Sequence, residues 1–396
     1  MLQGRSRSAP CHGFPVQTMI DPARQAILTQ AHTIVVKVGT NVLTAADGRL
    51  DRVRLQSLAD QIQRIRAGGR KVALVSSGAI GAGVGRLNLG TRPTDLRHLQ
   101  ACAAVGQSLL MAGYQECFDK HNMHTAQILL TASDFDNRTR YLNARNTIMT
   151  LFEYDVLPII NENDTVSVAE IKFGDNDHLA AMVTNLLQAP LLILLTNVDG
   201  LFSGDPGIDP KAEKIATVSS IDISVMEMAG ATKSVLGTGG MRSKLRAARL
   251  ATAAGESVIM ANGAAPGVLD AIFSCEPLGT LFLPHGSSLP AWKRWLGFTA
   301  RPKGKLLVND GAKRALCELG KSLLAVGIVE LKGAFSKGDV VALCDASGTE
   351  FARGLTNYSS EDTAQVLGLR TDQVAEVLGS FPYEEVVHRD NLVVTI

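Results

Sequence analysis

Short apolar segments alternate with amphipathic ones from Thr33 to Ala261. The apolar segments read TIVVKV, KVALVS, TAQILL, VLPII, LLILLT and SVIMA. The segments between them carry apolar residues at helical spacing, as in Leu55, Leu58 and Ile62. Strands that are apolar on both faces and joined by helices form a parallel sheet covered by helices on both sides. The pattern therefore predicts an α/β fold, with ligand sites at the carboxyl ends of the strands.

Composition excludes several classes of protein. The chain has 396 residues, enough for two or three domains, and its 46% hydrophobic and 19% charged residues are typical of globular proteins. A net charge of +1 gives no overall attraction to nucleic acid or to an anionic membrane. The six cysteines form no CxxC pair, which indicates reduced thiols rather than disulfides or a zinc site. Because no apolar run approaches the ~20 residues of a membrane helix, we expect a soluble, cytoplasmic protein.

The alternating pattern occupies only part of the chain. Residues 1–28 are basic and lack the apolar core of a signal peptide, so we expect a disordered N-terminal extension. Residues 29–290 form the predicted α/β domain, and residues 291–303 form a linker. Short strand patterns in residues 304–396 predict a small β-barrel.

The most polar segment, Asn161–Asp177, directly follows the apolar run VLPII. Its five carboxylates are Glu162, Asp164, Glu170, Asp175 and Asp177. Short polar side chains at the end of a buried strand are typical of a site for a charged small molecule. An acidic surface loop has the same composition, and this segment alone does not separate the two interpretations.

Three other strand ends carry residues suited to phosphate. Lys37 is the penultimate residue of TIVVKV, where an ammonium group is costly unless it meets an anion or reaches the protein surface. Glycines in Ser76–Gly83 let a ligand approach the backbone, or merely allow a helix to pack closely on the sheet. Gly237–Lys244 opens a helix with Gly, hydroxyl and Lys residues, as a phosphate-holding turn would. Neither a Walker A loop nor the G-x-G-x-x-G dinucleotide fingerprint occurs in this context. The pattern favours a phosphate-handling enzyme without a P-loop.

Five segments in this order resemble the glutamate 5-kinase family of the amino acid kinase superfamily. They read VVKVGTNVLT, SSGAIGAG, LNARNT, INENDTVSVAEIKFGDND and GTGGMRSK. The resemblance covers about Ile34 to the C-terminus, where residues 304–396 resemble a PUA domain. It implies an amino acid kinase-like sheet between helices, with residues 29–290 as the catalytic domain. Family members carry a similar KRW segment, so the resemblance also implies that Trp292 and Trp295 of the linker pack between the domains. It also implies phosphorylation of the side-chain carboxylate of L-glutamate by ATP with Mg²⁺, the first step of proline biosynthesis.

The resemblance also implies residue roles. Lys37 and Lys244 would contact the ATP phosphates and stabilise the transition state, while Asp177 would organise both ammonium groups. The glutamate-binding residues would be Ser77, Asp164 and Asn176. The ATP-binding residues would be Lys37, Thr196, Asn197, Thr238, Gly239, Gly240, Met241, Arg242, Ser243 and Lys244. No protein metal site is expected, since Mg²⁺ would arrive with the nucleotide.

The nucleotide side departs from the family pattern at one position. Asn197 stands where the family usually has Asp, so it offers an acceptor without a charge. The loop Asp199–Pro210 would cover the nucleotide or form an exposed turn.

Two rival functions have to be weighed. Other acyl-phosphate kinases, such as aspartokinase or acetylglutamate kinase, lack the INEND…GDND pairing and the PUA-like segment. An RNA-associated PUA protein with a regulatory kinase-like domain would need a basic surface. Residues 301–396 carry eleven Lys and Arg against thirteen Asp and Glu, so we expect a regulatory or assembly module that does not bind RNA. The resemblance further implies a homodimer or homotetramer, proline as a feedback inhibitor, and glutamyl phosphate reductase as a downstream partner.

Overall fold

An eight-stranded sheet forms the centre of the larger domain in the computed structural model, which describes residues 21–44, 50–167, 175–229, 240–284, 291–379 and 383–395. Its strand order is β3-β4-β2-β1-β5-β7-β8-β6. The strands are β1 (Thr33–Val38), β2 (Lys71–Ser76), β3 (Thr125–Leu130), β4 (Leu157–Glu162), β5 (Leu191–Thr196), β6 (Thr217–Val218), β7 (Ser257–Asn262) and β8 (Thr280–Phe282). The six apolar segments of the sequence correspond to β1 to β5 and β7.

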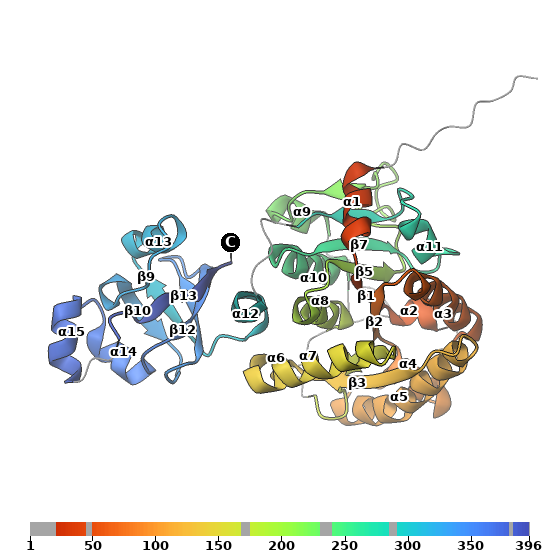
Figure 1. Ribbon diagram of the computed structural model, residues 1–396, viewed down its shortest axis with the longest axis horizontal. Coiled ribbons are helices and arrows are strands. Elements are labelled where there is room, and N and C mark those ends of the chain that lie inside the picture. Colours follow the sequence, from red (N-terminus) through yellow and green to blue (C-terminus); the bar gives the residue numbers. More distant parts are fainter. Residues whose placement is uncertain are drawn as a thin grey trace, which may run out of the picture.

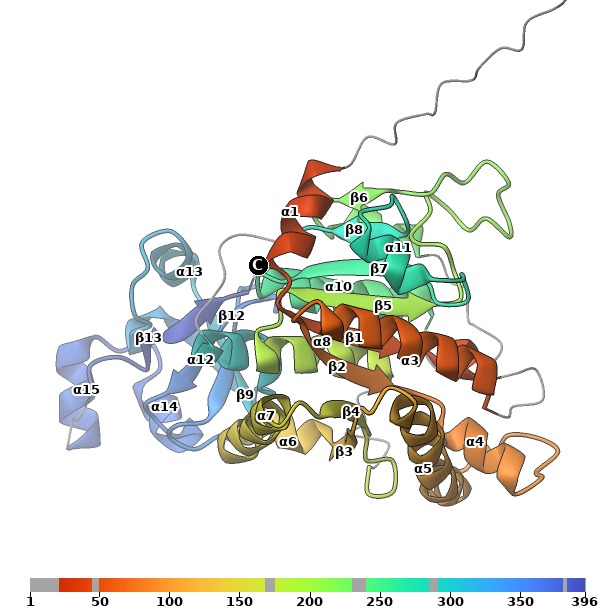
Figure 2. The ribbon, with the colours of Figure 1, turned by 45° about the vertical axis from the view of Figure 1, so that its right-hand side comes forward.

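These six strands run parallel to one another, and β8 pairs antiparallel with β7. In the register of the sheet, Lys37 of β1 lies between Val75 of β2 and Leu194 of β5. Figure 2 shows the arrows of β2 and β5 pointing to the same side. The carboxyl ends of β1, β2 and β5 therefore meet at one edge of the sheet, where the sequence predicted the ligand site.

Helices cover both faces of this sheet (Figure 1). The helices of the larger domain are α1 (Pro22–Gln30), α2 (Thr40–Leu43), α3 (Arg52–Ala67), α4 (Ala79–Arg86), α5 (Leu96–Asp119), α6 (Ala132–Asp136), α7 (Arg138–Glu153), α8 (Asn176–Leu187), α9 (Ile223–Met228), α10 (Met241–Ala253) and α11 (Val268–Phe273). Val35 of β1 faces a core shared with α7, α8 and α10, whereas Ile34 and Val36 face a core shared with α3 and α5. The strand is buried on both faces, as its continuous apolar sequence requires.

Several helices begin at a residue whose side chain caps the helix. The carboxylates of Asp51, Asp95 and Asp175 accept hydrogen bonds from backbone N–H groups in the first turns of α3, α5 and α8. Such caps satisfy N–H groups that have no partner within the helix.

Helices α4 and α5 pack unusually closely, because glycines stand at their crossing. A Cβ atom on Gly83 would lie 1.9 Å from the carbonyl oxygen of Cys102, and one on Gly106 would lie 1.7 Å from that of Ala79. The sequence predicted ligand approach or close helix–sheet packing for the glycines of the SSGAIGAG segment, and at Gly83 the close contact is instead between two helices.

The smaller C-terminal domain is built on a mixed five-stranded sheet in the order β10-β9-β11-β12-β13. Its strands are β9 (Gly304–Val308), β10 (Ile328–Lys332), β11 (Val340–Cys344), β12 (Glu350–Thr356) and β13 (Val387–Val394). Its helical segments are α13 (Asp310–Cys317), the 3₁₀ turn η2 (Ala325–Gly327), α14 (Ser360–Val366) and α15 (Thr371–Leu378). The predicted combination of a helix-covered parallel sheet and a small β domain is confirmed.

Most of the segment predicted as a linker is helical, and its second helix is largely buried. It forms α12 (Ala291–Arg294) and the π-helix η1 (Trp295–Thr299), and α12 lies between the two domains (Figure 1). The indole N–H of Trp295 donates to the carbonyl oxygen of Phe135, 2.9 Å away, and the guanidinium of Arg138 stacks on its ring. Val393 of β13 belongs to the same core as Trp295. The expected packing of Trp295 between the domains is confirmed.

The predicted disordered extension, residues 1–28, is wrong from Pro22 onward. Helix α1 begins there, and the buried guanidinium of Arg24 donates to the carbonyl oxygen of Leu278 at 2.7 Å. This contact fixes α1 beside the segment that joins α11 to β8. Residues 1–20 lie outside the described part of the chain. In that described part, no helix combines the length and apolar character needed to cross a membrane.

The crossing of α4 and α5 gives a prediction about stability. Gly106→Ala should lower the free energy of unfolding by about 1–3 kcal/mol, because the added methyl group forces the helices apart. Helix propensity alone predicts the opposite sign, since Ala favours a helix over Gly. Urea-induced unfolding followed by circular dichroism measures the difference.

The matched control is Gly90→Ala, where a Cβ atom meets nothing within 4 Å. Its stability should stay within about 0.5 kcal/mol of the wild type. A Gly106→Ala protein as stable as the wild type would show that the helices separate without cost.

Candidate active site

Two lysines hold one aspartate at the carboxyl edge of the sheet. The Nζ atom of Lys37, at the end of β1, lies 2.6 Å from Oδ1 of Asp177 in the first turn of α8. The Nζ atom of Lys244, in the first turn of α10, lies 3.1 Å from Oδ2 of the same carboxylate. All three side chains are at least nine-tenths buried. Three elements that are far apart in sequence therefore meet in one buried charge cluster with two positive groups and one negative group.

The two lysines decide the ionisation of Asp177. Burial by itself would raise the pKa of this carboxyl group, but the charges and hydrogen bonds of Lys37 and Lys244 outweigh it and hold the pKa below its usual range. Asp177 is thus ionised at neutral pH, and its charge offsets part of the cost of burying the two ammonium groups.

Asp175 has the opposite environment, although it is only two residues away. Burial raises its pKa, and the negative charge of Asp177 raises it further. Its Oδ1 accepts from the backbone N–H of His178 at 3.0 Å and caps α8. Its Oδ2 accepts a hydrogen bond from the hydroxyl of Ser243 in α10. Asp175 received no role from the sequence, and the structure makes it a direct link between the helices that carry Asp177 and Lys244.

The amide of Asn176 is held by the neighbouring strands. Its Nδ2 donates to the carbonyl oxygen of Ser76 and to Oδ1 of Asn161, both at 2.8 Å. Asn161 in turn donates to Oε1 of Gln107 in α5, also at 2.8 Å. The buried carboxylate of Glu162 accepts from the hydroxyl of Ser167 at 2.6 Å, which orders the turn after β4.

Ser77 lies where β2 turns into α4. Its backbone N–H donates to the carbonyl oxygen of Val38 at 3.1 Å, so the ends of β1 and β2 are joined. Gly78 follows with φ of +108°, a backbone conformation that favours glycine over any residue with a Cβ atom. Through this turn Ser77 lines the same cavity as Lys37 and Asn176.

Two cavities meet at Lys244. The larger, of about 230 Å³, has walls that include Leu201, Phe202, Met228 and Met241. The smaller, of about 80 Å³, is polar and is lined by Lys37, Ser77, Asn176 and Asp177, among others. Thr196, Asn197 and Lys244 line both cavities, so the two are adjoining parts of one site.

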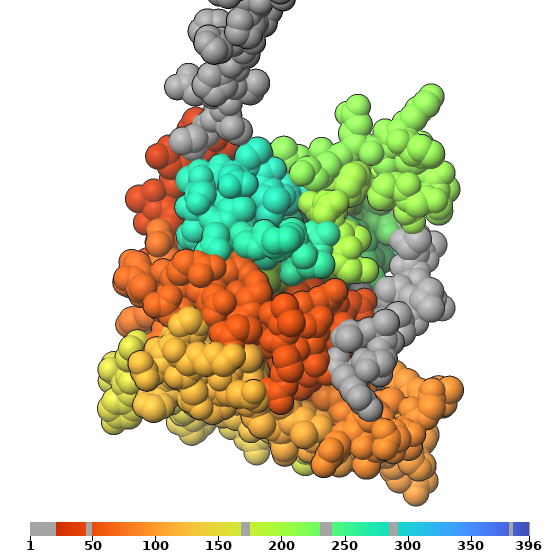
Figure 3. Space-filling view, turned by 90° about the vertical axis from the view of Figure 1, so that its right-hand side faces the viewer, coloured from red at the N-terminus to blue at the C-terminus, as the bar shows by residue number. Residues whose placement is uncertain are grey.

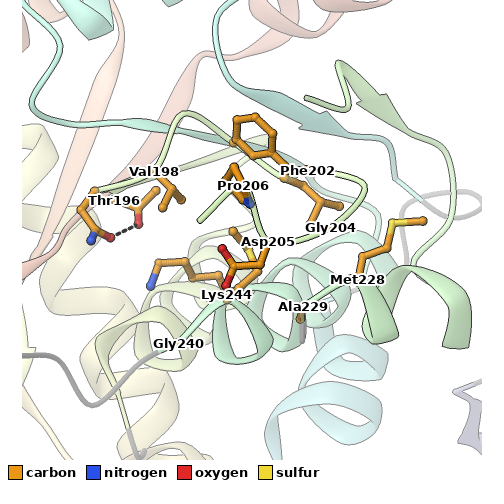
Figure 4. Close-up of a pocket in the computed structure, with 14 residues that line it drawn as sticks. Thr196, Val198, Phe202, Gly204, Asp205, Pro206, Met228, Ala229, Gly240 and Lys244 are labelled. Atoms are coloured by element: carbon orange, nitrogen blue, oxygen red, sulfur yellow. Dashed lines mark hydrogen bonds between the residues drawn. The ribbon is translucent and has the colours of Figure 1, made fainter. Parts of the chain in front are cut away.

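The close-up of the larger cavity (Figure 4) shows Lys244 on the same side as Thr196, with Met228 at the far end. Gly204, Asp205 and Pro206, from the loop after β5, line another side. The side of the molecule where the strands end is seen in Figure 3, with the green segment after β5 above the orange α2–α4 region.

Most of the predicted site residues are brought together. The residues that line at least one of the two cavities are Lys37, Ser77, Asn176, Asp177, Thr196, Asn197, Gly240, Met241 and Lys244. Arg242 is exposed and Ser243 bonds to Asp175, and neither lines these two cavities. Asp164 lies in the turn after β4, also outside their walls. Thr238, Gly239 and Glu170 fall outside the described residues.

Sequence reasoning missed Gln107, and it placed Asn161 in the polar segment without giving it a contact of its own. Asn161 stood inside the polar segment, but its partner lies in a helix 54 residues away. No local pattern in the sequence marks such a pair.

Comparison with known proteins places these features in context. Residues 32–262 match the amino acid kinase family, and residues 304–378 match the PUA domain. The glutamate 5-kinase of Geobacter sulfurreducens is 46% identical over 371 residues, which cover 94% of this chain and 100% of that protein. The glutamate 5-kinase of Trichlorobacter lovleyi is 47% identical over 370 residues, which cover 93% and 98% respectively.

Among solved structures, carbamate kinase from Giardia lamblia bound to AMP-PNP matches 65% of this chain and 100% of its own. Its 19% identity and TM-score of 0.49 make this likeness too distant to bear on the substrate.

The contrasting environments of the two aspartates predict opposite effects on stability. Asp177→Asn should cost about 3–5 kcal/mol of unfolding free energy at pH 8, because it leaves two buried ammonium groups without their anion. Asp175→Asn should be at least as stable as the wild type, since ionised Asp175 is disfavoured by burial and by Asp177. Urea-induced unfolding at pH 8 and pH 5 measures both.

The pH dependence follows from the direction of each shift. With its pKa lowered, Asp177 contributes its stability above the unfolded value of about 3.9, so the Asp177→Asn defect should persist at pH 5. With its pKa raised, Asp175 destabilises the fold once it ionises, so any advantage of Asp175→Asn should shrink as the pH falls. Equal losses of unfolding free energy in Asp177→Asn and Asp175→Asn would contradict the opposite pKa shifts assigned to the two carboxyl groups.

Proposed function

The chain belongs to the amino acid kinase family and, within it, to the glutamate 5-kinases, and from this premise we propose that it transfers the γ-phosphoryl group of ATP to the side-chain carboxylate of L-glutamate. The product is L-glutamyl 5-phosphate, and the reaction is the first step of proline biosynthesis. The observation that carries the proposal is the buried Lys37–Asp177–Lys244 cluster at the junction of an apolar and a polar cavity.

The chemistry sets what the site must supply. A glutamate side chain has a pKa of about 4.3 and is ionised at neutral pH, so the nucleophile needs no general base. Two anions, the carboxylate and the phosphate chain, must instead be held in line while charge on the moving phosphoryl group is neutralised. A site with positive groups fixed in advance meets this need better than one with a proton acceptor.

Lys37 and Lys244 fill this role in the proposal. Both ammonium groups are fixed by Asp177, so their positions are set before the substrates bind. They contact the phosphates of ATP and stabilise the negative charge of the transition state. Asp177 orients them and takes no part in proton transfer, in keeping with its lowered pKa.

The glutamate lies in the polar cavity, bound by Ser77, Asp164 and Asn176. The Ser77 hydroxyl and nearby main-chain N–H groups suit a carboxylate, whereas Asp164 suits the ammonium group. Asp164 lies in the turn after β4, so this proposal requires that turn to approach the cavity when glutamate binds.

The nucleotide occupies the larger cavity, with its base among the apolar side chains. The proposed ATP contacts are Lys37, Thr196, Asn197, Thr238, Gly239, Gly240, Met241, Arg242, Ser243 and Lys244. Mg²⁺ fits this site as an ion carried by the phosphates, because the Asp177 carboxylate is already engaged by two lysines. The ion would supply positive charge that offsets the charge of the phosphates.

Several wider features belong to the same proposal. The enzyme acts in the cytoplasm as a homodimer or homotetramer, is inhibited by proline, and passes its labile product to glutamyl phosphate reductase. Residues 29–290 form the catalytic domain, residues 291–303 the connection, and residues 304–396 a regulatory or assembly module. The excess of acidic over basic residues in 301–396 does not favour RNA binding as a second function.

A trapping assay tests the activity directly. The protein is incubated with ATP, Mg²⁺ and hydroxylamine, and with glutamate, aspartate or N-acetylglutamate as acceptor. An acyl phosphate is converted to a stable hydroxamate, and glutamate alone should give a strong signal. Absence of product with glutamate overturns the proposal, and a stronger signal with aspartate or N-acetylglutamate reassigns the substrate.

Lys244→Ala tests the catalytic role of the cluster. We expect turnover to fall by about 10²–10³-fold with a much smaller change in the glutamate KM, because the lost charge acts on the phosphoryl group. Arg246→Ala, which removes an exposed positive charge from the same helix, is the control and should keep wild-type kinetics. A large rise in the glutamate KM with unchanged turnover would show that Lys244 does not stabilise the transition state.

A further inference from the structure

Three side-chain amides, of Gln107, Asn161 and Asn176, form a series beside the polar cavity. Asn161 Nδ2 donates to Gln107 Oε1, and Asn176 Nδ2 donates to Asn161 Oδ1, each at 2.8 Å. The three residues come from α5, β4 and α8. The series therefore joins a long helix to the start of the helix that carries Asp177.

Backbone groups fix the orientation of two amides in the series, those of Asn161 and Asn176. The N–H of Glu162 donates to Asn161 Oδ1 at 2.9 Å, and the carbonyl oxygen of Ser76 accepts from Asn176 Nδ2 at 2.8 Å. An N–H group can only donate and a carbonyl oxygen can only accept. Reversing any one amide would set two donors or two acceptors against each other, so the polarity of the whole series is determined.

This polarity decides what Asn176 offers to a ligand. Both hydrogens of its Nδ2 are used, one on Ser76 and one on Asn161. Its Oδ1 has no hydrogen bond within the described residues, and Asn176 lines the polar cavity. An amide oxygen accepts hydrogen bonds and donates none. The partner of Asn176 must therefore be a donor, and in ionised glutamate the only strong donor is the α-ammonium group.

We propose that Gln107 is a positioning residue for substrate recognition, which acts through Asn161 to keep the Asn176 oxygen directed at the substrate ammonium. This inference rests on the proposed function and adds a determinant of specificity to it. The site should distinguish glutamate from glutarate, the dicarboxylate of the same length without an amino group.

Two observations on Gln107 support this role. Its Nε2 is buried and has no hydrogen-bond partner in the described part of the chain, which costs stability. An apolar side chain would avoid that cost. The hydrogen bond that Gln107 Oε1 accepts from Asn161 therefore explains why a glutamine stands at this position. Gln107 also adjoins Gly106, at the closest contact between α4 and α5, so its backbone has little freedom to move.

The test compares two substitutions that separate the acceptor from the donor of the Gln107 amide. Gln107→Met removes the acceptor, whereas Gln107→Glu keeps an acceptor oxygen and exchanges the unpartnered Nε2 for a second carboxyl oxygen. For each purified full-length variant, the hydroxamate assay gives kcat and KM for glutamate, KM for ATP, and the ratio of kcat/KM for glutamate over glutarate. Thermal unfolding establishes that each variant is folded.

We expect Gln107→Met to raise the glutamate KM by about tenfold or more, with kcat and the ATP KM within about threefold of wild type. Its preference for glutamate over glutarate should fall by a similar factor, because only the contact to the ammonium group is weakened. Gln107→Glu should keep both the KM and the preference within about threefold of wild type. A residue with a merely structural role would lower activity on both acceptors equally.

Three results would overturn the inference. They are an unchanged glutamate preference in Gln107→Met, a loss confined to kcat, and a Gln107→Glu protein with a glutamate KM raised tenfold or more. If Gln107→Met does not fold, the last measurement alone decides. An inactive wild type would instead contradict the proposed function, so the two failures are distinguishable.

Discussion

The site depends on the contact of one buried carboxylate, Asp177, with two buried ammonium groups. Neither lysine could be buried alone at acceptable cost, and the aspartate could not be buried ionised without them. Each lysine has a separate oxygen of the same carboxylate, at 2.6 Å and 3.1 Å, so their positions are coupled through Asp177. The cluster keeps an excess of one positive charge, which a bound phosphate chain can neutralise.

The topology of the sheet makes this contact possible. Strand β1 lies in the middle of the sheet between β2 and β5, so Lys37 at its end is surrounded by neighbouring strand ends. Helices α8 and α10 pack against each other on one face of the sheet, and both begin at this same edge. Their first turns therefore bring Asp177 and Lys244 to Lys37, and the Asp175–Ser243 hydrogen bond holds the two helix starts together.

The sequence predicts the fold well, because buried strands and amphipathic helices leave local patterns. The charged residues of the site could be selected from the sequence as well, since Lys37, Asp177 and Lys244 stand at strand or helix ends in recognisable segments. Contacts between distant segments leave no such mark. Arg24 anchors α1 by bonding to the carbonyl of Leu278, 254 residues away, so the N-terminal helix was mistaken for disordered chain.

The amide residues of the site could not be predicted from the sequence for the same reason, because their contacts join distant segments. Gly106 and Gln107 are neighbours in α5, but their partners lie in α4 and β4. Only the folded chain shows that the packing of Gly106 against α4 holds Gln107 in place for its hydrogen bond to Asn161. Close helix packing at Gly106 fixes the backbone of α5, Gln107 then fixes the Asn161 amide, and Asn161 fixes that of Asn176. Asn176 directly precedes Asp177 at the start of α8. The packing of two helices through glycine is thereby connected both to the polarity offered to the substrate and to the carboxylate that orders the lysines.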